Sequence, residues 1–222
     1  MKTSDNTHIS ELDRIQIPAT STSIDRYVFA NSWTKGKIVL DAATGYGFGA
    51  GILLSLGALR VTGVDLDVIA LKDAGDRFMS THLAFEKCDI FNLEEKYGKN
   101  SFEVCTSIET FEHLPPDRID EYLQQLRTVT TETIIITTPK RKTPTWEFDG
   151  GTHLYEYDPQ EFGEVLNRNF PNDDISVLGI VEIPLRCTIA GVPQQWGSTL
   201  VSDLNEAWVM MSVIHLNKED NG

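Results

Sequence analysis

One stretch near the N-terminus, Lys37–Ala50, limits the folds available to this chain more than any other. Its first half is an apolar run typical of a buried strand, and its second half has glycines at positions 45, 47 and 49. Apolar residues at helical spacing follow. Glycines let the backbone turn sharply and approach a ligand, and the N-terminus of the helix presents unpaired N–H groups. The order of strand, glycine-rich turn and helix predicts a nucleotide-binding α/β fold.

A second signal lies in Arg60–Asp65, which has the pattern of another strand and ends in an acid. Asp65 follows Gly45 by 65 − 45 = 20 residues. At this offset a carboxylate at the end of the second strand reaches the ribose hydroxyls of a bound nucleotide. The alternative is a tight strand-to-helix turn that binds no ligand.

Together these motifs resemble those of the class I S-adenosylmethionine-dependent methyltransferases. The matching pattern is Asp41-x-Ala43-x-Gly45-x-Gly47 followed by Gly63-Val64-Asp65. Ala43 departs from the first glycine of the family, whereas the two later glycines are kept. The resemblance covers residues 24–170. It implies S-adenosyl-L-methionine as methyl donor and a Rossmann-like, seven-stranded α/β sheet with an antiparallel terminal strand pair and helices on both faces.

The same resemblance implies the residues of the cofactor site. Arg26 would meet the methionine carboxylate, Asp65 the ribose, and Asp89 the adenine amine. A surface ion pair for Arg26 and a helix cap for Asp89 are the alternatives. A branched side chain at Gly47 is expected to abolish cofactor binding in a folded protein. The full expected set is Arg26, Asp41, Ala43, Gly45, Gly47, Asp65, Leu66, Asp89, Ile90, Ser107, Ile108 and Glu109.

The segment Glu109–His113 directly follows a predicted strand over residues 101–108. It resembles the Glu-x-x-Glu-His segment of many small-molecule and sugar methyltransferases. His113 and His153 are candidate catalytic bases because imidazole titrates near neutrality, and Glu112 or Glu109 is a candidate to orient one of them. A structural hydrogen bond is the alternative role for each histidine.

Glu109, Glu112, His113 and His153 also form a candidate metal set. The set resembles the magnesium-type site of small-RNA 3′-end 2′-O-methyltransferases and of ubiquinone-pathway O-methyltransferases. A divalent ion would bind vicinal oxygens of the acceptor. The same run occurs in relatives without metal, so the sequence does not favour a metal.

The remaining pattern fits the same fold. Apolar runs over 175–183 and 207–216 have no helix between them, only a predicted loop with Pro193 and Trp196, so they predict an antiparallel pair. Such a pair argues against the sheet of an NAD-type oxidoreductase. The basic run Lys140–Lys142 is interpreted as part of a solvated loop, with an anion-binding lip at the active site as the alternative. The long loop over 140–158 contains aromatic residues, Trp146 and Phe148 among them, and is expected to bind a ligand. Further elements are expected as helices over 23–33, 68–79, 118–129 (capped by Asp117) and 160–168, and as strands over 83–90 and 133–139.

Composition limits the partners and the compartment. The net charge of −14 argues against a nucleic-acid substrate, which needs clustered Lys and Arg. Three scattered cysteines, no signal peptide and no run of 18 apolar residues predict a cytoplasmic protein with reduced thiols and no membrane partner. The 222 residues are expected to form one domain, with a tail and cofactor-capping helix over 1–33 and a core over 36–222. The oligomeric state stays open, a homodimer included.

The sequence therefore predicts an S-adenosylmethionine-dependent methyltransferase acting on the oxygen or nitrogen of a small molecule such as a sugar or an aromatic hydroxyl. An NAD-type oxidoreductase, a metal-dependent RNA methyltransferase and a non-catalytic protein that keeps the cofactor pocket are the alternatives.

Overall fold

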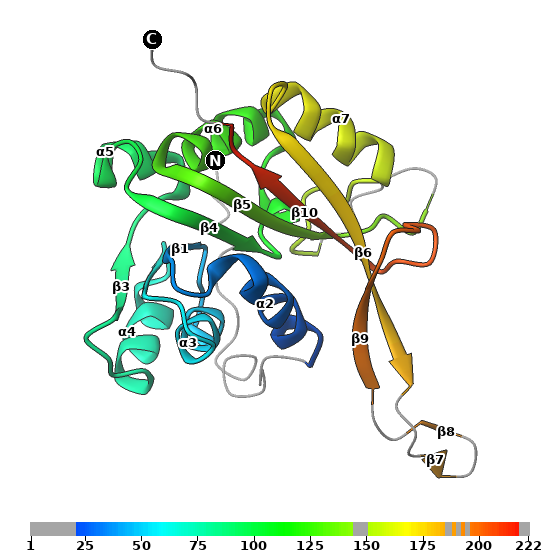
Figure 1. Cartoon of the computed structure of the whole chain (residues 1–222), viewed down its shortest axis with the longest axis horizontal. Helices are drawn as coiled ribbons and strands as arrows, with labels where there is room; N and C mark the ends of the chain where they lie inside the picture. Colours follow the sequence, from blue (N-terminus) through cyan, green and yellow to red (C-terminus); the bar gives the residue numbers. More distant parts are fainter. Residues whose placement is uncertain (1–20, 144–150, 185–187, 190–191, 194–195, 218–222) are drawn as a thin grey trace, which may run out of the picture.

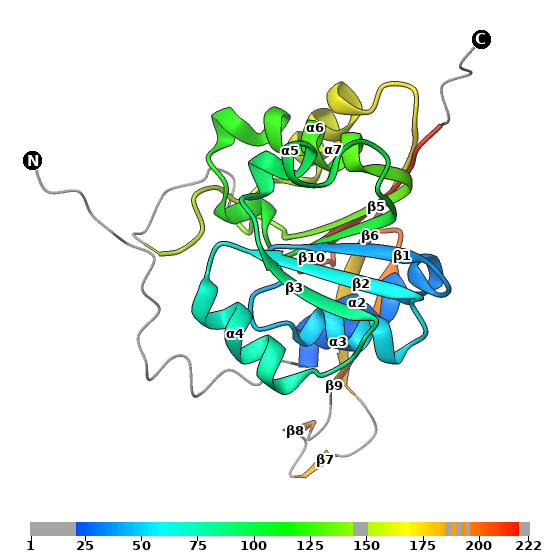
Figure 2. The ribbon, with the colours of Figure 1, turned by 90° about the vertical axis from the view of Figure 1, so that its left-hand side faces the viewer.

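The protein is built on one mixed sheet with helices on both faces. The computed structural model describes residues 21–143, 151–184, 188–189, 192–193 and 196–217. The strand order of the main sheet is β3-β2-β1-β4-β5-β10-β6-β9. Helices α2, α3 and α4 cover one face, and α5, α6 and α7 cover the other (Figures 1 and 2). The expected α/β sheet is confirmed, with eight strands instead of seven.

The N-terminal part of the sheet is parallel throughout, from β3 to β5. Strands β1, β2, β4 and β5 contain several β-branched residues and are mostly buried, as parallel strands between helices require, whereas the edge strand β3 is only partly buried. The strands are β1 Ile38–Ala42, β2 Arg60–Asp65, β3 Leu83–Lys87, β4 Phe102–Ile108 and β5 Thr130–Pro139. The helices are α2 Ser21–Thr34, α3 Phe48–Ser55, α4 Val68–Arg77, α5 Leu93–Tyr97, α6 Ile119–Val129 and α7 Pro159–Asn169. Short 3-10 helices span Ile90–Asn92, Phe111–His113 and Pro116–Arg118.

The C-terminal part of the sheet is antiparallel. Strand β10 (Val209–His215) lies between β5 and β6 (Asp174–Pro184) and runs antiparallel to both, which confirms the expected terminal pair.

The prediction that a loop joins these two strands is wrong in part. Residues Trp196–Val201 form β9, which pairs with β6 and adds the eighth strand. Thr188–Ile189 (β7) and Val192–Pro193 (β8) form a separate small ladder, and Figure 1 shows the β6–β9 ribbon extending beyond the body of the protein. Pro193 suggested a loop, yet the β-branched residues that follow it favour extended backbone.

Alternating strand residues fill two hydrophobic cores, one on each face of the sheet. In β5, Ile134 and Ile136 pack into the core beneath α5, α6 and α7, whereas Ile135 between them packs into the core beneath α2 and α3. This is the period of two expected for a strand. The sheet is therefore held from both sides, and its edge at the strand C-termini is fixed in place.

Helix ends follow the sequence signals with one exception. Asp158 caps α7 in a reciprocal capping box with Glu161, and Pro159 is its first residue. The expected cap of α6 by Asp117 is wrong. Pro116–Arg118 forms a 3-10 turn instead, and Arg118 precedes α6 and pairs with Glu121 at 2.8 Å.

The expected reduced thiols can be followed at two of the three cysteines. Cys88 and Cys105 are buried free thiols, and Cys187 lies outside the described residues. Trp146 and Phe148 of the expected binding loop also lie outside them. Among the residues that the structure describes, none of the helices combines the length and apolar character needed to cross a bilayer.

Close packing of α2 on α3 gives a stability prediction. A Cβ atom at Gly49 would lie 1.9 Å from the Tyr27 ring, whereas a Cβ at Gly75 in α4 would meet nothing within 4 Å. We expect Gly49→Ala to lower the free energy of unfolding by about 1–3 kcal/mol through overpacking. Gly75→Ala, the matched control, should raise it by about 0.5–1 kcal/mol through helix propensity. Urea denaturation measures both, and equal effects would contradict the packing seen here.

Candidate functional site

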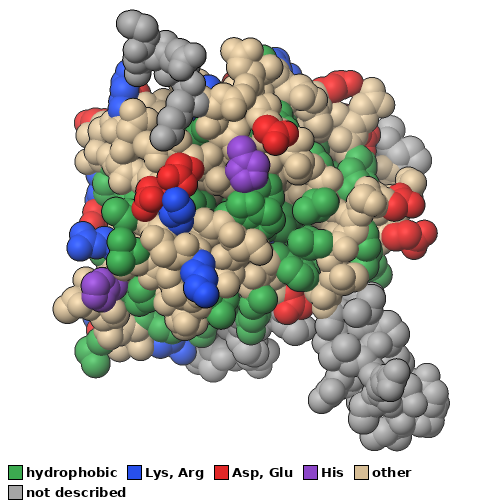
Figure 3. Space-filling view, in the orientation of Figure 1, with side chains coloured by type: hydrophobic (Ala, Val, Ile, Leu, Met, Phe, Trp, Pro, Cys, Tyr) green, Lys and Arg blue, Asp and Glu red, His purple; other side chains and the backbone are tan. Residues whose placement is uncertain are grey.

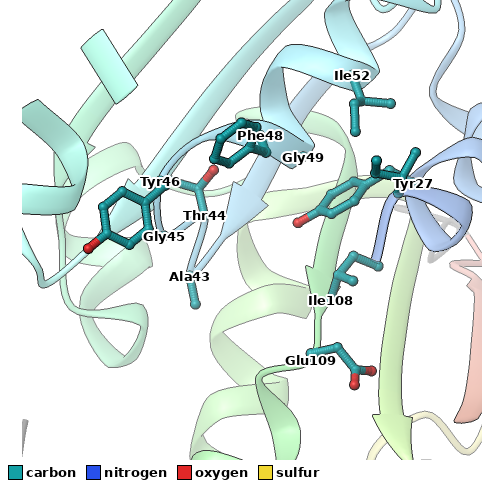
Figure 4. Close-up of a pocket in the computed structure, with 11 residues that line it drawn as sticks. Tyr27, Ala43, Thr44, Gly45, Tyr46, Phe48, Gly49, Ile52, Ile108 and Glu109 are labelled. Carbon is teal, nitrogen blue, oxygen red and sulfur yellow. The ribbon is translucent and has the colours of Figure 1, made fainter. Parts of the chain in front are cut away.

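The glycine-rich loop and α2 enclose a cavity of about 200 Å³ at the C-terminal edge of the sheet (Figure 4). Figure 4 shows Tyr27 from α2 on one side of it, Ala43 and Thr44 of the loop on another, and Glu109 at the end of β4. Open α/β sheets bind ligands outside these strand ends. The lining residues are Ile24, Tyr27, Ala43, Thr44, Gly45, Tyr46, Phe48, Gly49, Ile52, Ile108 and Glu109.

The loop owes its shape to three residues in the left-handed backbone region. Their φ angles are 59° at Ala43, 54° at Gly45 and 74° at Gly47. The two glycines adopt this conformation without strain, whereas an alanine there costs about 1–2 kcal/mol. Ala43 thus occupies a strained position, the one at which the resembled methyltransferases have their first glycine, and it lines the cavity.

Close approach of a ligand at Gly47 stays a prediction, and the structure adds a second reason for glycine at this position. A Cβ atom at Gly47 would lie 2.5 Å from the Phe85 ring and 2.7 Å from the Ala74 side chain, which belong to the protein interior. Gly47 is required because the start of α3 packs closely on β3 and α4. A branched residue at this position would therefore disturb the fold itself, and not ligand approach alone.

Asp65 lies beside this loop and holds it. Its carboxylate accepts a hydrogen bond from the Gly45 N–H at 2.8 Å and another from the Asp67 N–H at 2.9 Å. Each carboxylate oxygen has a second lone pair for a ligand. The structure thus brings together the two residues whose spacing first indicated a nucleotide site.

The other expected adenosine residues follow β2 and β3 at the same sheet edge. Leu66 is 57% exposed and Ile90 is buried, so they differ in the surface that they can offer to a ring. One oxygen of Asp89 accepts from the Phe91 N–H at 3.0 Å, so this carboxylate caps the 3-10 helix Ile90–Asn92. The capping alternative is therefore present in the structure, with the second oxygen of Asp89 left for a ligand.

Asp41 and Ser107 are fully buried beneath the site. The Asp41 carboxylate accepts hydrogen bonds from Tyr27 (3.3 Å), Thr44 (2.6 Å) and Thr106 (2.8 Å). Burial raises the pKa of Asp41 to about 6, although these three bonds favour its charged form. The Ser107 hydroxyl bonds to the Tyr122 hydroxyl. Asp41 and Ser107 therefore support the site from the protein interior. Neither residue lines the cavity described above or the second cavity described below.

Arg26 and Glu109 form an ion pair between α2 and the end of β4. The distance from Arg26 Nη2 to Glu109 Oε2 is 3.3 Å, and Thr137 donates to Glu109 Oε1 at 2.9 Å. Glu109 has a φ of 52°, so this carboxylate is placed by a strained backbone. The alternative of an ion pair for Arg26 is therefore present, as a partly buried pair and not a surface one, and its contact with a methionine carboxylate stays a prediction.

A second cavity, of about 310 Å³, lies on the other side of this ion pair. Glu109 lines both cavities, so they adjoin at its carboxylate. His153 lines the second cavity, and His113 lines neither. The lining residues are Arg26, Glu109, Pro139, Lys140, Lys142, His153, Glu156, Ile180, Ser198, Trp208 and Val209.

The two candidate histidines are neighbours, with ring centroids 5.0 Å apart. Nδ1 of His113 contacts the Thr152 carbonyl oxygen at 2.9 Å, and Nδ1 of His153 contacts Glu156 Oε1 at 2.7 Å. Both Nδ1 atoms therefore act as donors, which leaves Nε2 of each ring able to take a proton or bind a metal. Burial lowers the pKa of His113. Glu156, which the sequence analysis missed, orients His153 in the role expected of Glu109 or Glu112.

Glu112 completes a cluster with the two histidines. One ligand atom from each of Glu112, His113 and His153 lies within 4.8 Å of the others. Burial, with the nearby Glu109 carboxylate, raises the pKa of Glu112 above its ordinary range. Glu109, the fourth member of the expected metal set, is outside this cluster because it pairs with Arg26.

The expectation of a solvated basic run at Lys140–Lys142 holds at Lys142, which is exposed, and fails at Arg141. Arg141 is buried and pairs with Asp158 at 2.6 Å and Glu161 at 2.7 Å. Lys140 and Lys142 line the second cavity. The sequence analysis also missed Trp208 at this cavity, because nothing in its local pattern separates it from an ordinary strand residue.

Comparison with known proteins agrees with this geometry. Residues 39–133 match the family model described as a methyltransferase domain. The protein is similar in structure to magnesium protoporphyrin IX methyltransferase from Synechocystis PCC 6803 (15% identity, 89% of this chain and 82% of that one, TM-score 0.60). It is also similar to 1,6-didemethyltoxoflavin-N1-methyltransferase from Burkholderia thailandensis (17%, 90% and 79%, TM-score 0.64). Both were solved with bound S-adenosylhomocysteine.

A third similar structure is the methyltransferase domain of bacterial CtHen1-C (19% identity, 86% of this chain and 95% of that one, TM-score 0.61). A comparison with curated protein sequences finds no significant match. The shared architecture is that of class I methyltransferases.

The buried Asp41 gives a pH prediction. Its pKa in the folded state, about 6, exceeds its ordinary value of 3.8, so the folded state binds more protons and stability falls as pH rises from 4 to 6. Asp41→Asn removes this titration, and the three hydroxyl donors can reverse to bond the amide. We expect the unfolding free energy of wild type minus that of Asp41→Asn to be about 2 kcal/mol larger at pH 4.5 than at pH 7. Urea titrations at both pH values measure it, and a pH-independent difference would contradict a titrating Asp41.

Proposed function

We propose that this S-adenosylmethionine-dependent methyltransferase of the class I fold methylates a hydroxyl group of a small molecule. The observation that carries the proposal is the pair of cavities that adjoin at Glu109. The first takes the cofactor and the second takes the acceptor. Methyl transfer needs this arrangement because the acceptor oxygen must lie in line with the methyl carbon and the sulfur.

The cofactor is assigned along the sheet edge. Its methionine part occupies the cavity between α2 and the glycine-rich loop, near Arg26 and Tyr27. Its ribose meets Asp65, and its adenine lies by Leu66, Asp89 and Ile90. The assignment is supported by the single edge that all these strand ends share.

His153 is proposed as the base because it lines the acceptor cavity and Glu156 orients its ring. The acceptor oxygen forms a bond to the methyl carbon while the carbon–sulfur bond breaks. The electron pair stays on sulfur, which gives neutral S-adenosylhomocysteine, and the hydroxyl proton passes to His153 Nε2. The His113 ring packs edge-on against the His153 ring, and burial keeps His113 neutral.

A small acceptor is supported by the size of the second cavity and by the surface charge. Its volume of about 310 Å³ lies at the lower end of the range for small-molecule sites. On the face drawn in Figure 3, outside the grey atoms, Lys and Arg side chains are scattered among acidic and hydrophobic ones. Nucleic-acid binding favours a basic stripe, so a small molecule is the better proposal.

A metal-assisted reaction is the second candidate, and the cluster of Glu112, His113 and His153 is the observation that favours it. One carboxylate and two imidazoles suit several divalent ions, and each ring is already oriented through Nδ1. The three side chains would hold the ion, which would lower the pKa of an acceptor hydroxyl.

The cofactor assignment predicts a binding defect. Asp65→Ala removes a charge-assisted hydrogen bond to the ribose, of order 1.5–3 kcal/mol, and a tether of the loop. Calorimetry should show S-adenosylhomocysteine binding weakened about tenfold or more. Asp76→Ala, which removes an exposed carboxylate of α4 paired with Lys72, is the matched control and should bind normally. Unchanged affinity in Asp65→Ala would overturn the ribose assignment.

The assignment of His153 as the base predicts how much turnover each variant of this cluster loses. If His153 acts as a base, His153→Ala should lower turnover by about 10²–10⁴-fold and spare cofactor affinity. Glu156→Gln should cause a smaller loss, and wild type should be active in excess chelator. Turnover with an identified acceptor and calorimetry with S-adenosylhomocysteine measure the two effects.

The metal candidate predicts a different pattern. Alanine at Glu112, His113 or His153 would each cost similar activity, their effects would not add, and chelator would inactivate wild type until Mg²⁺ or Mn²⁺ is returned. Full activity in both His113→Ala and His153→Ala would overturn both candidates and leave positioning of the acceptor as the mechanism.

A further inference from the structure

We propose that the acceptor is a hydroxylated aromatic carboxylic acid, held through its carboxylate by Lys142 and through its ring by Trp208. The inference rests on the proposed function and adds the chemical class of the acceptor. It comes from the surface of the second cavity, which combines an exposed aromatic ring, an apolar wall and a cation.

The apolar part of the cavity suits a flat ring. Pro139, Ile180 and Val209 line it, and Trp208 stands at the same cavity with 57% of its surface exposed. A large indole surface left in water favours a partner that covers it, and aromatic rings pair with one another in stacked or edge-on arrangements. A sugar or an aliphatic alcohol would use this surface less well.

The backbone at Trp208 is held in place before any ligand binds. The main-chain N–H of Trp208 donates to the Ile180 carbonyl at 3.1 Å, and the main-chain carbonyl of Trp208 accepts from the Lys140 main-chain N–H at 2.9 Å. The Lys140 ammonium donates to the carbonyls of Leu204 (2.8 Å) and Asn205 (2.6 Å), which fixes the segment leading to Trp208. A backbone anchored on both sides lowers the entropy cost of placing the indole against a flat acceptor.

Lys142 provides the cation. Its ammonium lies 4.9 Å from the centre of the Trp208 ring, and its side chain is exposed. In the described part of the chain, no carboxylate lies within 4.0 Å of it. A ring that packs near Trp208 can therefore carry its acidic substituent to Lys142.

The other charged groups of the cavity are engaged within the protein. Arg26 pairs with Glu109, and Glu156 contacts His153. Three cations and two carboxylates line the cavity, so its net charge is +1 with His153 neutral, whereas the whole chain carries −14. The local field at this cavity thus favours an anion that the rest of the surface repels.

The same cavity positions the reacting group. His153 and Glu109 line it together with Lys142, and Glu109 also lines the cofactor cavity. The ring hydroxyl takes the methyl group and gives its proton to His153, as in the proposed reaction. The carboxylate takes no part in the chemistry and serves only for recognition.

The test uses calorimetry on the full chain with S-adenosylhomocysteine present. The probes are 4-hydroxybenzoate and 6-hydroxy-2-naphthoate, each compared with its neutral carboxamide. We expect at least one acid to bind wild type about tenfold or more tightly than its amide, with a preference that weakens in 0.5 M salt. Lys142→Met should remove the preference, and Trp208→Ala should weaken acid and amide alike by about five- to tenfold. Lys72→Met on α4 is the matched control and should behave like wild type.

The outcomes distinguish a failure of this inference from a failure of the proposed function. Equal affinity for acid and amide, or no binding of either acid at millimolar concentration while S-adenosylhomocysteine binds, would overturn the acceptor class alone. A preference that survives in Lys142→Met would overturn the role of Lys142. Failure of S-adenosylhomocysteine to bind would instead overturn the proposed function.

Discussion

The buried carboxylate of Asp41 is the interaction on which the site depends. It accepts hydrogen bonds from Tyr27 in α2, Thr44 in the glycine-rich loop and Thr106 in β4. One group therefore joins three segments that are far apart in the chain. Burial of this charge costs free energy, and the hydrogen bonds offset part of that cost. The protein thus gives up stability in order to fix the walls of a cavity.

Strain is concentrated at the same edge of the sheet. Ala43 and Glu109 both adopt positive φ angles, one in the loop and one at the end of β4. Glu109 is held there by Arg26 and Thr137, so its carboxylate stands where the two cavities meet. Strained residues persist when their surroundings determine them strongly, and here the strain places a carboxylate where the two cavities adjoin.

In the histidine cluster, hydrogen bonds at Nδ1 decide which ring nitrogen is available for chemistry. Nδ1 of His113 is held by a main-chain carbonyl and Nδ1 of His153 by Glu156, so both rings have Nε2 available. That arrangement serves a general base and a metal ligand equally well, because both need a neutral imidazole with a free lone pair. The buried Glu112 decides between them through its own ionisation, since a metal ligand must be charged.

The sequence by itself determined the fold class and most elements, and it predicted the edge of the sheet at which we propose that the cofactor binds. Strand β2 was predicted at its observed bounds, and the terminal antiparallel pair followed from the missing crossover helix. These features are local or depend on spacing, so a single chain can specify them. The pairing of Asp65 with Gly45 also follows from spacing, because both lie at the ends of adjacent parallel strands.

Only the tertiary structure decided which side chains share a site. Gly47 is required by Phe85 and Ala74, Glu109 belongs with Arg26, and His153 belongs with Glu156. The strand β9 and the placement of Trp208 beside Lys142 likewise came from packing between distant segments. Local pattern gives the type and period of each element, whereas contacts between elements depend on how the whole chain packs, which spacing along one segment does not specify.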